Sequence, residues 1–125
     1  MTDRMSVAEY RGLKSGRARV KGAKTVIVNG WRFQSRLEAD RYVHWRNLWQ
    51  LGVIAWFTRQ MPFYLPGSII YRLDFFIVGG VSAACPPLKY EDCKGHLTDV
   101  SRNKIKQVED IYKIKIDIIT REDMR

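Results

Sequence analysis

The stretch IIYRLDFFIVGGVSAACPPLKYEDCKG, residues 69–95, holds two β-prone runs separated by a region rich in glycine and proline. Short apolar runs bounded by such breakers predict strands over residues 69–78 and 88–93. Asp74 interrupts the first run and lies eighteen positions before Asp92 in the second. That separation is long enough for the chain to turn at the glycines and prolines. We therefore expect the second strand to return alongside the first.

The flanking segments predict the remaining helices and strands. Asn29-Gly30 favours a two-residue hairpin turn, and apolar residues at helical spacing predict a helix from Ser35 to Gly52. The order predicts an α/β (α+β) domain with a central mixed, largely antiparallel β-sheet flanked by helices. In chain order, we expect a hairpin over 25–33, a helix over 35–52, strands over 54–58, 61–65, 69–78 and 88–93, a helix over 97–112 and a strand over 113–119.

Length and charge favour one domain that binds a polyanion. A chain of 125 residues with 46% hydrophobic content suits one core and is too short for two. The formal net charge of +9 favours nucleic acid as the partner over anionic lipid or an acidic protein. We expect a single domain over residues 24–125, preceded by a basic N-terminal arm over residues 1–23.

Cations crowd this arm and the residue after it, with glycines and few large apolar side chains among them. We expect such a segment to be flexible in part, and its charge suits contacts with DNA phosphates. A solubilising tail without a partner is the alternative. The cations assigned to DNA binding here are Lys14, Arg17, Arg19, Lys21 and Lys24.

Neither a membrane nor a zinc site is favoured. The most apolar run is broken by Arg72 and Asp74, which a bilayer-spanning helix would have to bury, and the N-terminus lacks the hydrophobic region of a signal peptide. Cys85 and Cys93 have no CxxC companion and no His pair, so we expect free thiols. These features predict a soluble, cytoplasmic protein.

The motif Asp92-Cys93-Lys94 places an acid and a lysine on one face of its strand, because side chains alternate between faces. A carboxylate beside a cation at that spacing suits metal binding and the stabilisation of a phosphate or a nucleophile. Glu91 has the opposite parity to Lys94, so Asp92 is the better choice of acid. A solvated ion pair on a strand surface is the alternative reading.

Two further acids are candidates for the same site. Asp74 lies in an apolar strand, where an unpaired carboxylate is costly and therefore needs a partner; an ion pair with Arg72 is the alternative. Glu38 follows Ser35 at the spacing of a capping box. Glu38 also shares the inward-facing stripe of its helix with Tyr42, Trp45 and Trp49, which favours a buried carboxylate with a function.

The ordered set of a helix glutamate, a strand aspartate and D-x-K in the next strand resembles the PD-(D/E)XK nuclease superfamily. The phrases FQSRLEADRY, LDFFIV and YEDCKG are similar to those of a group of small phage-encoded proteins assigned to it. The resemblance covers roughly residues 24–119. Leu73 stands where the superfamily's name has a proline, a position that often varies.

The resemblance implies a restriction-endonuclease-like core with a metal-dependent site. Asp74 and Asp92 would be ligands of one or two Mg²⁺ (or Mn²⁺) ions, Glu38 would bind directly or through water, and Lys94 would orient the nucleophilic water. In related nucleases a polar residue on a neighbouring strand and a basic residue on the following helix contact the scissile region. The similar positions here are Gln60 and Lys104, which are explained equally well as ordinary polar residues of the protein surface. Arg102, on the same predicted helix, is also assigned to DNA binding.

The resulting expectation is an endonuclease selective for branched DNA, similar to a Holliday junction resolvase in phage recombination or packaging. A homodimer is expected by analogy, because several small members of the superfamily are dimeric resolvases. The alternative function is a non-catalytic nucleic-acid-binding module with a nuclease-like fold. The acids distinguish the two, since pure phosphate binding favours lysine and arginine over converging carboxylates.

Overall fold

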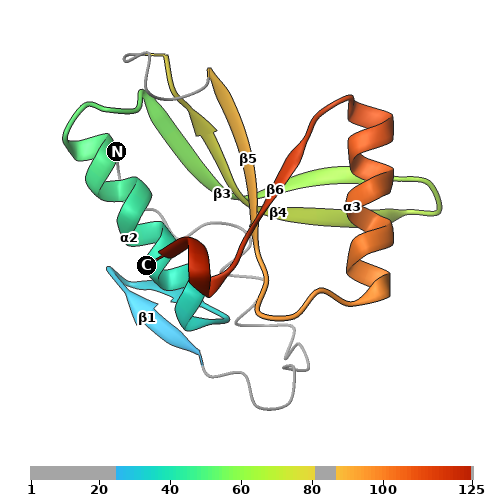
Figure 1. Cartoon of the computed structure of the whole chain (residues 1–125), viewed down its shortest axis with the longest axis horizontal. Helices are drawn as coiled ribbons and strands as arrows, with labels where there is room; N and C mark the ends of the chain where they lie inside the picture. Colours follow the sequence, from blue (N-terminus) through green and yellow to red (C-terminus); the bar gives the residue numbers. More distant parts are fainter. Residues whose placement is uncertain (1–24, 81–86, 125) are drawn as a thin grey trace.

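The computed structural model of the chain describes residues 25–80 and 87–124. Its fold is α+β, with a two-stranded antiparallel sheet, a four-stranded mixed sheet and two helices (Figure 1). The expected fold class is confirmed at this level. The basic arm over 1–23, with its assigned cations, and the residues Lys24 and Cys85 lie outside the described residues.

The N-terminal hairpin and the first helix form where the sequence predicts them. β1 (Val26–Val28) pairs with β2 (Trp31–Phe33), and the turn residues Asn29 and Gly30 take the positive φ angles of 53° and 81° that this turn requires. Ser35 then caps α2 (Arg36–Gln50) by accepting the backbone N–H of Glu38.

The four-stranded sheet has the order β3-β4-β5-β6. β3 pairs antiparallel with β4 and β4 with β5, whereas β6 runs parallel to β5. A parallel pair needs a crossover, which α3 supplies because it lies between β5 and β6 in the chain. The elements are β3 (Trp56–Leu65), β4 (Ile69–Val78), β5 (Leu88–Cys93), α3 (Asp99–Tyr112), β6 (Ile116–Ile119) and the short 3-10 helix η1 (Arg121–Met124).

The sequence predicts two strands over 54–58 and 61–65, and this is wrong, because β3 is continuous through Pro62. β3 is an edge strand of the sheet. A proline, which has no N–H to donate, is tolerated at such an edge.

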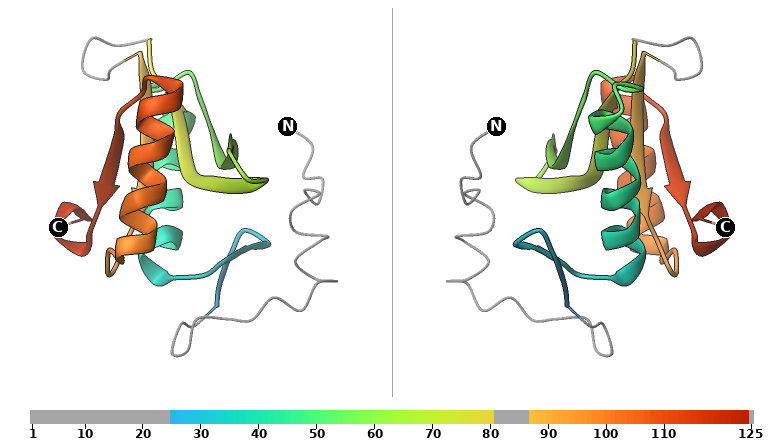
Figure 2. Two further views of the ribbon diagram at one scale, coloured as in Figure 1. Left: turned by 90° about the vertical axis from the view of Figure 1, so that its right-hand side faces the viewer. Right: turned by 90° about the vertical axis from the view of Figure 1, so that its left-hand side faces the viewer.

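The two helices cover opposite faces of the sheet (Figures 1 and 2). On the α2 side, Tyr42 and Trp45 pack in one core cluster with Phe57, Phe75 and Ile77. On the α3 side, a second cluster of buried residues contains Phe63, Leu65, Tyr71, Leu73, Ile105 and Val108.

The β3–β4 hairpin changes the face that it buries part-way along its length. Leu73 and Phe75 are two positions apart and would share a face in a regular strand, yet Leu73 belongs to the α3-side cluster and Phe75 to the α2-side cluster. The pairing register is the same before and after this point, so no residue is inserted. Gln60 lies at the same level with φ +56°, and Figure 2 shows the hairpin changing direction part-way along. We call this feature the Gln60 bend.

Within the described part of the chain, neither helix has the length and apolar character needed to cross a bilayer.

In a regular strand valine is more stable than glycine. Because of the Gln60 bend, we expect the opposite order at position 60. Glycine accepts a positive φ without strain, whereas a β-branched side chain there costs about 1–2 kcal/mol. Both substitutions remove the amide, so their difference isolates the backbone. We expect Gln60→Gly to exceed Gln60→Val in free energy of unfolding, measured by urea denaturation.

The matched control is Thr58, a regular position of the same strand that pairs with Phe76. There valine is the better strand former, and Thr58→Val should be more stable than Thr58→Gly. The same order at both positions would contradict a backbone origin of the bend.

Candidate functional site

Asp74 and Asp92 lie side by side at the join of β4 and β5. Phe75 pairs with Glu91 in this antiparallel ladder. Asp74 precedes Phe75 and Asp92 follows Glu91, so the two aspartates occupy the adjacent position of the ladder. Asp74 Oδ2 accepts the backbone N–H of Cys93 at 2.8 Å. The expectation that the second strand returns beside the first is thus confirmed.

Asp92 is a buried carboxylate, with 1% of the residue exposed. Its Oδ2 accepts a hydrogen bond from the Tyr71 hydroxyl, and Lys94 Nζ lies 3.2 Å from the same oxygen. Asp92 and Lys94 therefore share a face, as alternation predicts, but the carboxylate is buried, unlike that of a solvated surface pair. Oδ1 is also buried, and it has no hydrogen-bond partner among the described residues.

Glu38 joins this region from the first turn of α2. Its backbone N–H binds Ser35 Oγ at 3.1 Å, but its carboxylate points inward: Oε1 lies 3.3 Å from Gln60 Nε2 and 3.6 Å from an Arg59 guanidinium nitrogen. Ser35 thus caps the helix, while the Glu38 side chain faces the sheet, as its place on the inward stripe predicts.

Gln60 bridges two of the candidate acids. Its Nε2 donates to Glu38 Oε1 and, at 3.2 Å, to Asp74 Oδ1. The sequence assigns Gln60 to DNA contacts; the structure places it between the acids, at the bend. The alternative in which Arg72 pairs with Asp74 finds no support in the described residues, where Gln60 and Cys93 are the partners.

Burial and mutual repulsion raise the pKa values of two acids. Burial is the main cause that raises the pKa of Glu38; the Asp92 charge adds to it, while Arg59 acts in the opposite direction. Burial likewise raises the pKa of Asp74 well above its ordinary 3.8, followed by the hydrogen bond with Asp92 and the charge of Glu38. An acid with a raised pKa gives stability that is present at low pH and lost as the pH rises through the folded-state pKa. Ionising this site therefore costs stability unless a cation compensates.

The donor chemistry fits a hard divalent cation, although a ready three-ligand cluster is not formed. Among the described residues, no three Asp, Glu, His or Cys side chains are arranged to hold a metal ion. The sequence suggests that the three acids converge directly. In the structure they do not, because Gln60 stands between Glu38 and Asp74. Carboxylate oxygens are what Mg²⁺ and Mn²⁺ prefer, and Oδ1 of Asp92 is a buried oxygen of that kind without a hydrogen-bond partner among the described residues.

Glu91 serves a different purpose from its neighbour, as its opposite parity predicts. It is fully buried and accepts two hydrogen bonds from Arg41, Nε to Oε1 at 2.8 Å and one from Nη2 to Oε2 at 2.5 Å. Trp45 Nε1 donates to Oε1 at 2.7 Å, and Lys89 Nζ lies 3.4 Å from Oε2. Glu91 thus anchors α2 to β5 on the face opposite the Asp92–Lys94 pair.

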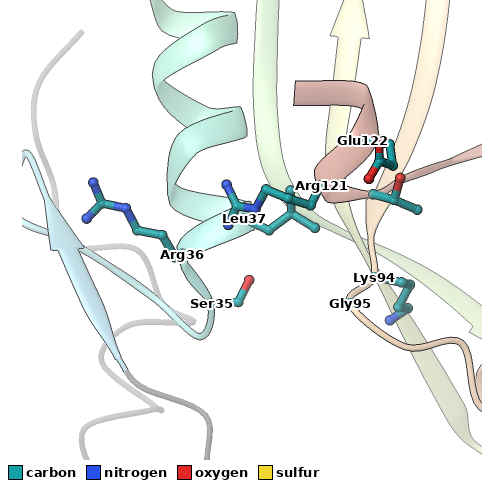
Figure 3. A pocket seen from close by; sticks show the side chains of 8 residues that line it. Ser35, Arg36, Leu37, Lys94, Gly95, Arg121 and Glu122 are labelled. Carbon is teal, nitrogen blue, oxygen red and sulfur yellow. The ribbon is translucent and has the colours of Figure 1, made fainter. Parts of the chain in front are cut away.

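A shallow pocket of about 370 Å³ adjoins Lys94. Figure 3 shows Lys94 and Gly95 on one side of it, the start of α2 on another and η1 above. Arg36 and Arg121 both pair with Asp40, at 3.2 and 2.8 Å. The pocket gives an outside molecule a path to the Lys94 end of the site. The residues that line it are Ser35, Arg36, Leu37, Lys94, Gly95, Thr120, Arg121 and Glu122.

The remaining candidates lie on α3. Arg102 is exposed and Lys104 half-buried there, and the described structure gives neither of them a contact with the acids. Their assignment to DNA stays a prediction.

Sequence reasoning missed Tyr71 and Arg59. Strand alternation places Tyr71 on the face opposite Asp74, and only the Gln60 bend brings its hydroxyl to Asp92. Arg59 reaches Glu38 next to the same bend. The local sequence gives no signal for a positive φ at a glutamine, so neither contact could be inferred.

Comparison with protein-family models, with curated proteins and with solved structures found no match to this chain.

The buried ion pair predicts a large effect of Arg41→Met on stability. This change leaves the Glu91 carboxylate buried without its main partner, which costs about 3–5 kcal/mol. Arg36→Met removes an arginine of the same helix whose side chain is 71% exposed in its pair with Asp40, and should cost less than about 1 kcal/mol. Urea denaturation measures both, and equal losses would contradict an anchoring role for the buried pair.

Proposed function

We propose that this protein is a metal-dependent endonuclease that hydrolyses DNA phosphodiester bonds and belongs to the PD-(D/E)XK superfamily. The observation that carries the proposal is the meeting of Asp74 and Asp92 on adjacent strands, with Lys94 on Asp92 and one buried Asp92 oxygen without a partner. An ordinary ion pair on a strand surface would not explain the second buried acid or the carboxylate oxygen that has no hydrogen-bond partner.

The three acids have complementary roles in this proposal. Asp74 and Asp92 hold Mg²⁺ or Mn²⁺, and Glu38 joins them directly or through water after Gln60 moves from between it and Asp74. Such an ion, when bound, supplies positive charge beside the phosphate and makes water easier to deprotonate. The raised pKa values of Glu38 and Asp74 support this assignment, since perturbed carboxylates gather at functional sites.

Lys94 acts on the substrate side of the site. Its ammonium is held by Asp92 while its side chain also lines the open pocket. A cation fixed in this way can orient the attacking water and stabilise the charge that develops on the phosphate in the transition state. Because Lys94 is paired with the buried Asp92, its ammonium is already in place and does not have to move before the reaction.

DNA as the substrate rests on charge, and branched DNA on the resemblance. The net charge of +9 suits a polyanion, and the shape and backbone charge of DNA are features that such a surface can recognise. By analogy with small junction resolvases, we propose a homodimer whose two sites cut opposing strands.

A non-catalytic nucleic-acid-binding module is the second candidate. One observation favours it: the described acids already have protein partners, and no three of them form a ready metal cluster. The two functions differ in one respect: the nuclease requires the acids to rearrange around a cation, and the binding module does not.

The central prediction is Mg²⁺- or Mn²⁺-dependent cleavage of a labelled immobile four-way junction near its branch point. Ca²⁺, whose coordination is looser, should support binding without cutting. A denaturing gel compares the junction with a flap, a splayed arm, a linear duplex and a single strand at equal concentration, and the linear forms should be cut more slowly.

Asp92→Asn is the inactive control against contaminating nuclease, and Asp110→Asn, an exposed aspartate on α3, is the matched active one. Preference for a flap or a single strand would reject the resolvase and keep the nuclease. Tight binding without cleavage of any DNA or RNA would establish the non-catalytic module instead.

A second prediction compares two lysines of equal exposure. The side chains of Lys94 and Lys89 are each 27% exposed and each pair with a buried acid, on opposite faces of β5. Lys94→Ala should lower kcat about 100-fold or more with little change in DNA affinity, because a fixed cation acts mainly on transition-state charge. Lys89→Ala should leave kcat near that of the parent. Equal losses of binding and rate on Lys94→Ala would make it an ordinary phosphate contact.

A further inference from the structure

Tyr71 is the residue of β4 whose hydroxyl contacts a candidate ligand of the site. It is buried, with 6% of the residue exposed, and its hydroxyl donates to Asp92 Oδ2. Its ring packs in the α3-side cluster with Leu73 and Val108. A phenol hydroxyl carries one O–H donor, which Tyr71 directs to this carboxylate oxygen of Asp92.

The two donors to Asp92 gather on one of its oxygens. Lys94 Nζ lies 3.2 Å from Oδ2, the same atom that accepts the Tyr71 hydroxyl. Two donors on one oxygen fix the rotation of the carboxylate, and they leave Oδ1 buried without a partner among the described residues. A buried acceptor without a partner costs about 1–3 kcal/mol. Such atoms in native proteins are commonly completed by an ion or a water.

The Gln60 bend is what makes this arrangement possible. Tyr71 and Asp74 are three positions apart on β4, so a regular strand would direct them to opposite faces. The hairpin changes its buried face between Leu73 and Phe75, and the Tyr71 hydroxyl therefore reaches the acid beside Asp74. The strained backbone at Gln60 thus has a consequence at Asp92.

We propose that Tyr71 is a positioning residue of the metal site: by holding Asp92 Oδ2 together with Lys94, it keeps Oδ1 directed to the divalent cation. This inference rests on the proposed function, because it concerns the same cation. Tyr71 touches neither the substrate nor the cation; it acts through Asp92. Hydrogen-bond partners of metal ligands commonly set metal affinity in this way.

The experiment measures Mn²⁺ binding to the full chain without DNA, by the loss of the free-ion signal in electron paramagnetic resonance. Tyr71→Phe removes one hydroxyl and keeps the ring, and it should weaken Mn²⁺ affinity about tenfold or more. Tyr112→Phe is the matched control, because that hydroxyl, at the end of α3, bonds to the same hairpin through the backbone of Tyr64. It should bind Mn²⁺ as the parent does. Asp92→Asn should lose more affinity than either.

The shift in melting temperature on adding Mn²⁺ separates positioning from packing. Lost packing lowers the melting temperature equally with and without Mn²⁺, whereas lost positioning shrinks the shift itself. Parent-like affinity and shift in Tyr71→Phe, with Asp92→Asn impaired, would overturn the inference and leave the proposed function standing. Mn²⁺ binding that Asp92→Asn leaves unchanged would overturn the proposed site, and the inference with it.

Discussion

The bidentate ion pair between Arg41 and Glu91 is the contact on which the rest of the site depends. It joins the middle of α2 to β5, and Arg41 Nη1 also donates to Met124 Sδ of η1 at 3.7 Å. Because a buried charge without its partner is costly, few other placements of α2 on the sheet are compatible with this sequence. The position of Glu38 in the first turn and the pocket between α2 and η1 both follow from it. An anchor on one face of β5 thereby fixes the geometry on the other.

The two adjacent acids of YEDCKG lie on opposite faces of one strand and differ in how fully they are hydrogen-bonded. Glu91 faces α2 and has four donors or cations around it, from Arg41, Trp45 and Lys89. Asp92 faces the other way and keeps an oxygen without a partner. A fully satisfied buried acid rigidifies its surroundings, whereas Asp92 has an acceptor oxygen left over. Alternation in the strand is the reason that both can occur in consecutive residues.

The sequence predicts the positions of helices and strands better than it predicts which face of each strand is buried. The hairpin, both helices, the strands over 69–78 and 88–93 and the pairing of Asp92 with Lys94 follow from local rules of turn chemistry, periodicity and alternation. The Gln60 bend does not, because a positive φ at a non-glycine residue is set by the tertiary packing of two opposed cores. Two features beside this bend are not predicted by the sequence: the Tyr71 contact with Asp92 and the bridge from Gln60 to two acids.

The described charges of this site do not balance one another. Glu38, Asp74 and Asp92 bring three carboxylates, whereas the cations in contact with them are Arg59 and Lys94. Full ionisation therefore leaves an excess negative charge in a buried place, and the raised pKa values of Glu38 and Asp74 express that cost. Two remedies exist in principle: an acid keeps its proton, or a cation enters. A proton shared between Asp74 and Asp92 is one remedy, because their hydrogen bond is among the causes that raise the pKa of Asp74. A divalent ion is the other: it would satisfy the buried Oδ1 of Asp92 and reverse the sign of the excess charge, and a negatively charged phosphate binds more readily to a site of positive charge.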